Sequence, residues 1–183
     1  MNTFVGTIVD DRFKISSPLG RGGMGAVFLA HDKKTDRQVA VKFLYGGVAT
    51  HQLEERFQRE YKMMANLSHP NIATLYAGGR DEETSHLWYA MELIDGKSIS
   101  DLIEEEAPLD YERVKNILEQ VATAFIYIHP QGIIHRDITP RNILLTEQGR
   151  VVLVDFGLAR DLALTAMTAS GMVMGTPHYM SPE

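Results

Sequence analysis

Two short motifs in the second half of the chain carry residue types that handle protons and metal ions. The first is HRDITPRN at residues 135–142, and the second is DFG at residues 155–157. Asp137 can accept the proton of a hydroxyl group, while Asn142 and Asp155 supply the oxygen ligands that Mg²⁺ prefers. Phosphoryl transfer depends mainly on positioning and charge neutralisation, so it needs such groups rather than a covalent nucleophile. The two motifs therefore indicate phosphoryl transfer.

A glycine cluster near the start of the chain has the spacing of a phosphate-binding loop. The segment GRGGMGAV at residues 20–27 contains Gly20, Gly22 and Gly25. Glycine has no Cβ, so its backbone amide can approach phosphate oxygens closely. Dinucleotide-binding folds use the same spacing, but there the turn leads into a helix. Here residues 27–29 continue as an apolar, strand-like run, which favours a hairpin that covers phosphates.

A lysine and a glutamate follow at positions suited to holding those phosphates. In VAVK at residues 39–42, the two-residue period of a strand places Ala40 and Lys42 on one face. Glu60 lies beside the apolar face of the next expected helix, where its carboxylate can pair with Lys42. Without the glycine cluster, Lys42 would be an ordinary surface lysine. Most helical glutamates are likewise only solvated, so Glu60 alone is a weak signal.

The elements that must position these residues are mainly strands at first and mainly helices later. Strand-like runs are expected at residues 13–19, 26–31, 38–44, 72–76 and 87–93. A helix is expected at residues 52–67, where apolar residues recur at helical spacing. A short helix at 98–105 and a longer one from Asp110 to Ile128 come next, followed by short strands at 143–145 and 151–154.

The composition excludes several other classes of protein. A formal net charge of −6 gives no general basic character, so we expect no nucleic-acid partner. The chain contains 0 Cys, which excludes disulfides and thiolate metal sites. Its seven His are scattered along the sequence, so we expect no structural metal site. Neither a secretory signal nor an apolar run of ~20 residues is present in this sequence, so we expect no membrane segment in it. We expect a cytoplasmic location, whether or not a membrane anchor follows in the parent protein.

With these motifs, the sequence resembles the eukaryotic-like serine/threonine protein kinases of bacteria. GGMG at residues 22–25 and GTPHYMSPE at 175–183 carry the resemblance further, and it spans about residues 13–183. It implies an α+β, bilobal fold with a β-rich N-lobe at residues 1–94 and a partial, mainly helical C-lobe at 95–183. It also implies ATP with Mg²⁺ or Mn²⁺ as cofactors, and protein substrates that are phosphorylated on serine or threonine.

The resemblance also assigns residues around the nucleotide base. Met91 resembles the gatekeeper, and the Glu92 carbonyl and the Ile94 amide would meet adenine. Four apolar residues would sandwich the base: Leu19, Val27, Ala40 and Leu144. Four others resemble the stacked spine that joins the lobes: Met64, Leu75, His135 and Phe156. Each of these apolar residues is equally a candidate for plain core packing.

Arg136, directly before Asp137, points to regulation by phosphorylation. In similar kinases, a phosphate on the activation segment neutralises this arginine and orders that segment. The candidate acceptors are Thr165, Thr168 and Ser170, with the latter two favoured by their distance from residues 175–177. Unmodified loop hydroxyls are the alternative.

The sequence departs from the family pattern two residues after Asp137. Similar serine/threonine kinases carry lysine there, whereas this chain has Thr139. A neutral hydroxyl cannot offset charge on the transferred phosphoryl group. Arg141 is the candidate that supplies the missing charge, because tyrosine-specific relatives place an arginine at that position.

The second departure concerns length, because the family pattern continues into several further helices after residue 183. Without them, the apolar side of the helix ending at Ile128 would face water. We therefore expect marginal stability of the second lobe, or self-association through its exposed surface. The truncation and the missing lysine make phosphotransfer by this chain itself doubtful.

Two other functions remain open from sequence alone. A non-catalytic nucleotide-binding or interaction module is the first, favoured by Thr139 and the missing helices but opposed by the presence of all five core polar residues. A small-molecule phosphotransferase is the second, and the segments at residues 135–137 and 175–183 speak against it.

Overall fold

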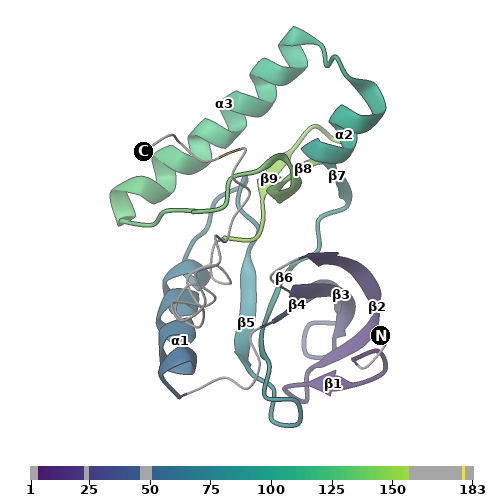
Figure 1. The fold of residues 1–183 in the computed structure, drawn as a ribbon, viewed down its shortest axis with the longest axis vertical. Helices are drawn as coiled ribbons and strands as arrows, with labels where there is room; N and C mark the ends of the chain where they lie inside the picture. Colours follow the sequence, from purple (N-terminus) through teal and green to yellow (C-terminus); the bar gives the residue numbers. More distant parts are fainter. Residues whose placement is uncertain (1–3, 23–24, 46–50, 157–178, 180–183) are drawn as a thin grey trace. The chain divides into compact units, whose positions relative to one another are not determined.

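The structure is a computed structural model that describes residues 4–22, 25–45, 51–156 and 179. The described backbone divides into two compact units (Figure 1). The first contains the described residues of Met1–Asn66 and Thr74–Leu93, and the second those of Leu67–Ala73 and Ile94–Gly157. Among the helices described, none combines the length and apolar character needed to cross a bilayer.

The first unit is built on a curled antiparallel sheet (Figure 1). Its strands follow the order β1-β2-β3-β4-β6-β5. Their bounds are β1 Ile8–Val9, β2 Phe13–Gly22, β3 Gly25–Asp32, β4 Arg37–Leu44, β5 Leu75–Arg80 and β6 Leu87–Glu92. Four of the five strands expected in this unit therefore form, and β1 is an addition that the sequence patterns did not reveal.

The core of this unit lies on one face of the sheet. Residues directly opposite each other on neighbouring strands project to the same face. Val41 pairs with both Phe28 and Ala90, and Phe43 pairs with Trp88. These five residues belong to one buried apolar cluster, which also contains Val9, Phe13, Ile15, Ala30 and Val39. The opposite face is thus left for other contacts.

Helix α1, His51–Ala65, packs against β5 in the first unit (Figure 1). Phe57 and Met64 are its buried residues, as the apolar spacing predicts. The helix ends at Ala65, earlier than the predicted 67, because the Asn66 side chain donates to the Lys62 carbonyl. Such local side-chain bonds compete with continuation of a helix.

A buried ion pair joins the strand ends of the first unit. Asp32, at the end of β3, is fully buried and accepts two hydrogen bonds of 2.7 Å from the Arg12 guanidinium. Its carboxylate also accepts from the Thr35 hydroxyl and the Lys34 amide. The hydrogen bonds from Arg12 hold the pKa of Asp32 well below its usual range. The carboxylate is therefore charged and fully partnered.

The second unit combines two helices with a small sheet. The helices are α2 Ile99–Glu106 and α3 Tyr111–Ile128, and the strands are β7 Gly96–Ser98, β8 Ile143–Thr146 and β9 Val151–Leu153, in the order β7-β8-β9. Short 3₁₀ turns cover His129–Gln131 (η1) and Pro140–Asn142 (η2). Asp110 caps α3 as expected, accepting from the amides of Glu112 and Arg113. Ser98 forms a capping box with Asp101 at the start of α2.

The expected strand at residues 72–76 forms only in part. Ile72 makes an isolated parallel bridge to Leu153, and β5 begins at Leu75. The Ala73 amide donates to the Leu153 carbonyl, and the Leu153 amide donates to the Asn71 carbonyl. The backbone of residues 71–73 is therefore hydrogen-bonded to β9 and belongs to the second unit. This pairing over a long sequence separation leaves no local signal.

Candidate functional site

The glycine cluster forms the hairpin that its pattern predicts. β2 and β3 are antiparallel neighbours, and their register ends with Gly22 opposite Gly25. A Cβ at Gly25 would lie 2.2 Å from the Phe43 carbonyl oxygen, so the close approach of β4 requires glycine there. A Cβ at Gly20 or Gly22 would meet nothing within 4 Å. Packing thus explains Gly25, whereas the open space at Gly20 and Gly22 suits the approach of a phosphate.

Lys42 lies on the face of the sheet opposite the apolar core. It pairs in register with Val27, and Ala40 pairs with Met91, which also faces Leu75 on β5. All five residues therefore share one face. Lys42 is only 7% exposed, and Ala40 and Met91 are buried. Four predicted nucleotide-site or spine residues are thus assembled around the lysine by strand register alone.

Leu19 lies at an irregularity of β2, where the register with β3 shifts between Pro18 and Gly20. Its side chain is 50% exposed. A half-exposed leucine next to the glycine hairpin fits the predicted contact with a base, because an apolar ligand surface would cover it.

Glu60 has a partner other than the predicted Lys42. Its Oε1 accepts a hydrogen bond of 3.1 Å from Arg56 Nε, one helical turn earlier on α1. Pairs at this spacing are common on helix surfaces. The ion pair between Glu60 and Lys42 stays a prediction, and Arg56 competes for the carboxylate.

The two predicted adenine-binding backbone groups belong to different units. The Glu92 amide donates to the Thr74 carbonyl, and the Thr74 amide donates to Glu92 Oε2, which fastens the end of β6 in the first unit. In the second unit, Ile94 and Leu144 pack against a cluster of Ala73, Val152 and Val154. The assignment of these groups to adenine stays a prediction.

Asn142 is held by Asp137 within the second unit. Its amide nitrogen donates to the Asp137 backbone carbonyl at 2.8 Å and to Asp137 Oδ2 at 2.9 Å. Both N–H groups of the side-chain amide are therefore used, and among the described residues Asn142 Oδ1 accepts no hydrogen bond. Oxygen is the donor type that Mg²⁺ prefers. This arrangement fits the predicted metal-binding role of Asn142.

Two residues of the motifs have positive φ angles. Arg136 has φ 65° and Asp155 has φ 58°. Such left-handed conformations are uncommon for residues other than glycine and cost about 1–3 kcal/mol. Arg136 adjoins the predicted base Asp137, and Asp155 is itself a predicted metal ligand, so both lie where backbone strain commonly orients side chains.

His135 contacts two residues in and next to the DFG segment, Val154 and Phe156. Its Nε2 lies 3.0 Å from the Val154 carbonyl oxygen, which can only accept, so Nε2 carries the proton. Its ring contacts Phe156 at a centroid distance of 4.5 Å. Both rings are buried. This contact joins two of the four predicted spine residues.

Acid should destabilise the second unit through His135. Burial lowers the pKa of His135 below its ordinary 6.5, because the charged ring would lose its hydration. The unfolded chain therefore binds the extra proton, and the stability present above pH 6.5 is lost as the pH falls. Thermal unfolding followed by circular dichroism should show a falling midpoint below that pH. A His135→Phe variant should show a smaller loss; an equal loss would contradict this role.

Thr139 and Arg141 differ sharply in exposure. Thr139 is buried and borders an apolar groove between α2 and α3, so its hydroxyl is not on the open surface. Arg141, in η2 next to Asn142, is exposed. The candidate phosphorylation sites Thr165, Thr168 and Ser170, and Gly157 of the second motif, lie outside the described residues.

Sequence comparison assigns the chain to a family. The family model described as protein kinase domain matches residues 13–183. The serine/threonine-protein kinase PrkC of Bacillus subtilis is 36% identical over 180 residues, which cover 98% of this chain and 28% of PrkC. PknA of Mycobacterium tuberculosis is 34% identical over 187 residues, which cover 100% of this chain and 43% of PknA. The chain thus spans less than half the length of these relatives.

Comparison with solved structures indicates the same family. The PknI kinase domain of M. tuberculosis superposes with a TM-score of 0.75 and 32% sequence identity, over 84% of this chain and 61% of that domain. From the family match, the two catalytic motifs and this shared fold, the chain belongs to the protein kinase family.

Proposed function

We propose that this chain is the catalytic part of a protein serine/threonine kinase, which transfers the γ-phosphoryl group of ATP to serine or threonine hydroxyls of proteins. Curated relatives with 34–40% identity are named as serine/threonine-protein kinases. The chain retains a candidate residue for every step of that reaction. Substrates, partners and cellular location are part of the proposal, because the chain spans only part of those relatives.

Each candidate residue has a distinct role. Gly20 and Gly22 let the hairpin backbone approach the phosphates, and Lys42 offsets their charge. Asn142 and Asp155 would hold Mg²⁺ or Mn²⁺, which supplies charge neutralisation to the phosphates when it is bound. Asp137 accepts the proton of the attacking hydroxyl.

The observation that carries the proposal is the pair of hydrogen bonds from Asn142 to Asp137. One side chain fixes the orientation of the candidate base through its nitrogen and would leave its oxygen for the proposed metal ion. A purely structural asparagine would satisfy its oxygen as well as its nitrogen within the fold. The non-catalytic binding module has no use for this geometry.

The test compares nucleotide binding with phosphate transfer. With Mg²⁺ present, we expect the chain to bind ATP and to label a mixture of serine- and threonine-containing peptides from γ-labelled ATP. Asp155→Ala should weaken Mg²⁺-dependent ATP binding and abolish labelling, because one metal ligand is lost. Binding without any labelling would identify a non-catalytic module, and labelling that survives in Asp155→Ala would reject the assigned metal site.

Arg141 is proposed to supply the charge that Thr139 cannot. Removing one donor aimed at the transferred group typically costs 10²–10³ in rate. Arg141→Ala should therefore slow peptide labelling by about that factor with ATP affinity retained. Arg59→Ala, an exposed change of the same charge on α1, serves as the control. An unchanged rate in Arg141→Ala, while Asp137→Asn abolishes labelling, would show that Arg141 has no such role.

Two further features complete the proposal. Phosphorylation of Thr165, Thr168 or Ser170 would bring a charge that Arg136 can pair with. Self-association would cover the apolar groove that α2 and α3 line in the second unit. Phosphosite mapping after incubation with Mg-ATP, and the mass in solution by light scattering, measure these two features separately.

A further inference from the structure

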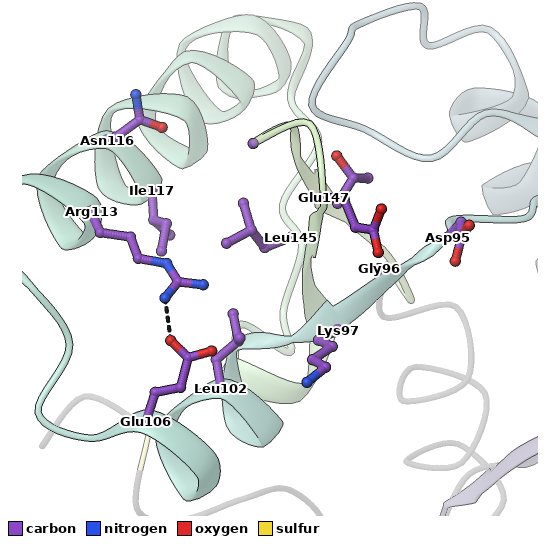
Figure 2. Close-up of a pocket in the computed structure, with 12 residues that line it drawn as sticks. Asp95, Gly96, Lys97, Leu102, Glu106, Arg113, Asn116, Ile117, Leu145 and Glu147 are labelled. Carbon is purple, nitrogen blue, oxygen red and sulfur yellow. Dashed lines mark hydrogen bonds and ion pairs between the residues drawn. The ribbon is translucent and has the colours of Figure 1, made fainter.

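Two packing features lie outside the steps assigned above. The first is a pocket of about 550 Å³ in the second unit, lined by α2, α3 and the β7–β8 pair (Figure 2). Its Arg113 forms an ion pair with Glu106, drawn as a dashed line. Its Lys97 forms one with Glu105, so both cations are neutralised within the fold. The second feature is the packing of helix α1 on strand β5 in the first unit, and it leads to Lys42.

Helix α1 turns one side toward β5. Phe57 and Tyr61 are four residues apart on that side, and their rings stack at a centroid distance of 6.1 Å. Phe57 is buried, and Tyr61 is partly buried. Glu54, three residues before Phe57, forms an ion pair of 3.5 Å with Arg80 at the end of β5. Charge therefore fastens the first half of the helix to the strand.

Tyr61 fastens the second half, at a place where β5 has no side chain. A Cβ at Gly78 would lie 2.8 Å from Tyr61 Cδ2 and 2.9 Å from Tyr61 Cε2. Carbon atoms in ordinary contact are about 3.5–4.0 Å apart, so the ring fills the space that a side chain at Gly78 would need. Gly78 does not have a positive φ, and packing rather than backbone conformation therefore explains the glycine.

Gly78 lies in the same cross-strand row as Lys42. Tyr89 on β6 pairs in register with Gly78 on β5 and with Lys42 on β4. Because directly opposite residues project to the same face of a sheet, Tyr61 packs on the face that carries the Lys42 side chain. Neighbouring strands are ~4.8 Å apart, which places Gly78 roughly 10 Å from Lys42 along the row. The contact thus sets the height of α1 above that row.

Glu60 is the residue directly before Tyr61, so the position of the ring also fixes that of the Glu60 carboxylate. Its Oε1 accepts from Arg56, and its Oε2 can accept from Lys42. To reach ordinary contact with a Cβ at Gly78, the Tyr61 ring would have to move by about 1 Å. Glu60 would move with it, because the backbone of a helix is one hydrogen-bonded unit. A misplacement of about 1 Å can cost 10²-fold in rate.

We propose that Gly78 is a positioning residue for the phosphotransfer reaction. Its missing side chain lets Tyr61 seat α1 at the height at which Glu60 pairs with Lys42. This inference rests on the proposed function, in which Lys42 offsets the charge of the phosphates. It adds two residues that contact neither nucleotide nor metal, and it assigns them an effect that passes through Glu60.

The first test measures the coupling between Lys42 and Glu60 in the full 183-residue chain without nucleotide. Urea midpoints from Trp88 fluorescence are compared for Lys42→Met, Glu60→Gln and the double variant. If the two residues pair, the double variant shifts the midpoint less than the sum of the single variants. We expect this deficit in the wild-type background and its loss in the Gly78→Ala background.

Gly79→Ala is the matched control. A Cβ at Gly79 would lie 3.8 Å from the Trp88 ring, which is an ordinary contact, so the deficit should persist in this background. Tyr61→Ala supplies a second comparison, because it removes the ring without adding a clash. Gly78→Ala should therefore shift the urea midpoint no further when Tyr61→Ala is already present.

The second test measures catalysis. Gly78→Ala should slow peptide labelling at saturating ATP by about 10²-fold, whereas Gly79→Ala should leave it unchanged. Combined with Glu60→Gln, Gly78→Ala should slow labelling no further, because its effect passes through Glu60.

Several results would overturn the positioning role. These are no coupling in the wild-type chain, coupling that persists in Gly78→Ala, equal loss in Gly79→Ala, or additive slowing by Gly78→Ala and Glu60→Gln. The urea measurements need no catalysis. A chain that labels no peptide, but shows the coupling and its loss in Gly78→Ala, would therefore reject the proposed function alone.

Discussion

Asp137→Asn is expected to lower phosphate transfer by about 10²–10⁴-fold, the usual contribution of a general base. An amide cannot accept the substrate proton, but its oxygen can still receive the hydrogen bond that Asn142 now donates to Asp137 Oδ2. The loop should therefore keep its shape, and ATP affinity should be retained. Single-turnover labelling of a peptide from γ-labelled ATP, with ATP affinity measured in parallel, separates chemistry from binding.

The parallel binding measurement makes this result interpretable. A loss of labelling together with a loss of ATP affinity would mean that the substitution disturbs the site as a whole. Wild-type labelling by Asp137→Asn would remove Asp137 from the mechanism.

Asp32→Ala is expected to destabilise the first unit by about 3 kcal/mol. Removal of one partner from a buried ion pair typically costs 3–5 kcal/mol, and the lower value applies because Arg12 keeps access to water at 21% exposure. Domains have only about 5–15 kcal/mol of net stability. Urea unfolding followed by fluorescence reports on this unit, because Trp88 is the one tryptophan and is buried in its core, 5.5 Å from the Phe13 ring.

A matched control lies four residues away. Asp36 is 95% exposed in the turn between β3 and β4, and its φ of 52° is tolerated by asparagine, so Asp36→Asn should shift the urea midpoint little. Equal shifts for the two variants would mean that Asp32 contributes no more than a surface carboxylate. The charge on Asp32 is also sensitive to acid. Since its pKa is lowered in the folded state, its stabilisation is lost as the pH falls below the ordinary 3.8.

Local patterns were enough to predict most of the elements. The strand period in VAVK predicts that Ala40 and Lys42 share a face, and the register with β3 and β6 brings Val27 and Met91 to that face. Asp110 is an N-cap in both sequence and structure, because a cap depends on neighbours only three residues away. The glycine hairpin is likewise a local feature.

Contacts between distant segments were not predictable in the same way. The parallel bridge between Ile72 and Leu153 leaves no sequence pattern, so the start of β5 was misplaced. The ion pair of Arg12 with Asp32, 20 residues apart, was missed for the same reason. Arg56 could have been recognised as a partner for Glu60 from its i, i+4 spacing, but the family resemblance directed attention to Lys42.

In the catalytic motif, the residue types were predictable from the sequence, but their contacts and exposure were not. Its residue types predict a base and metal ligands, yet the hydrogen bonds from Asn142 to Asp137 appear only in three dimensions. The sequence equally does not show that Thr139 is buried while Arg141 is exposed. Because Arg141 is charged and exposed, it remains the candidate for the missing charge.

A crystal structure of the chain with Mg²⁺ and a non-hydrolysable ATP analogue measures the central claim most directly. The account predicts one bound nucleotide whose phosphates contact Lys42 and the glycine hairpin, with the metal on Asn142 Oδ1 and Asp155. A nucleotide bound elsewhere, or Lys42 and Asp155 facing separate cavities in that complex, would contradict it.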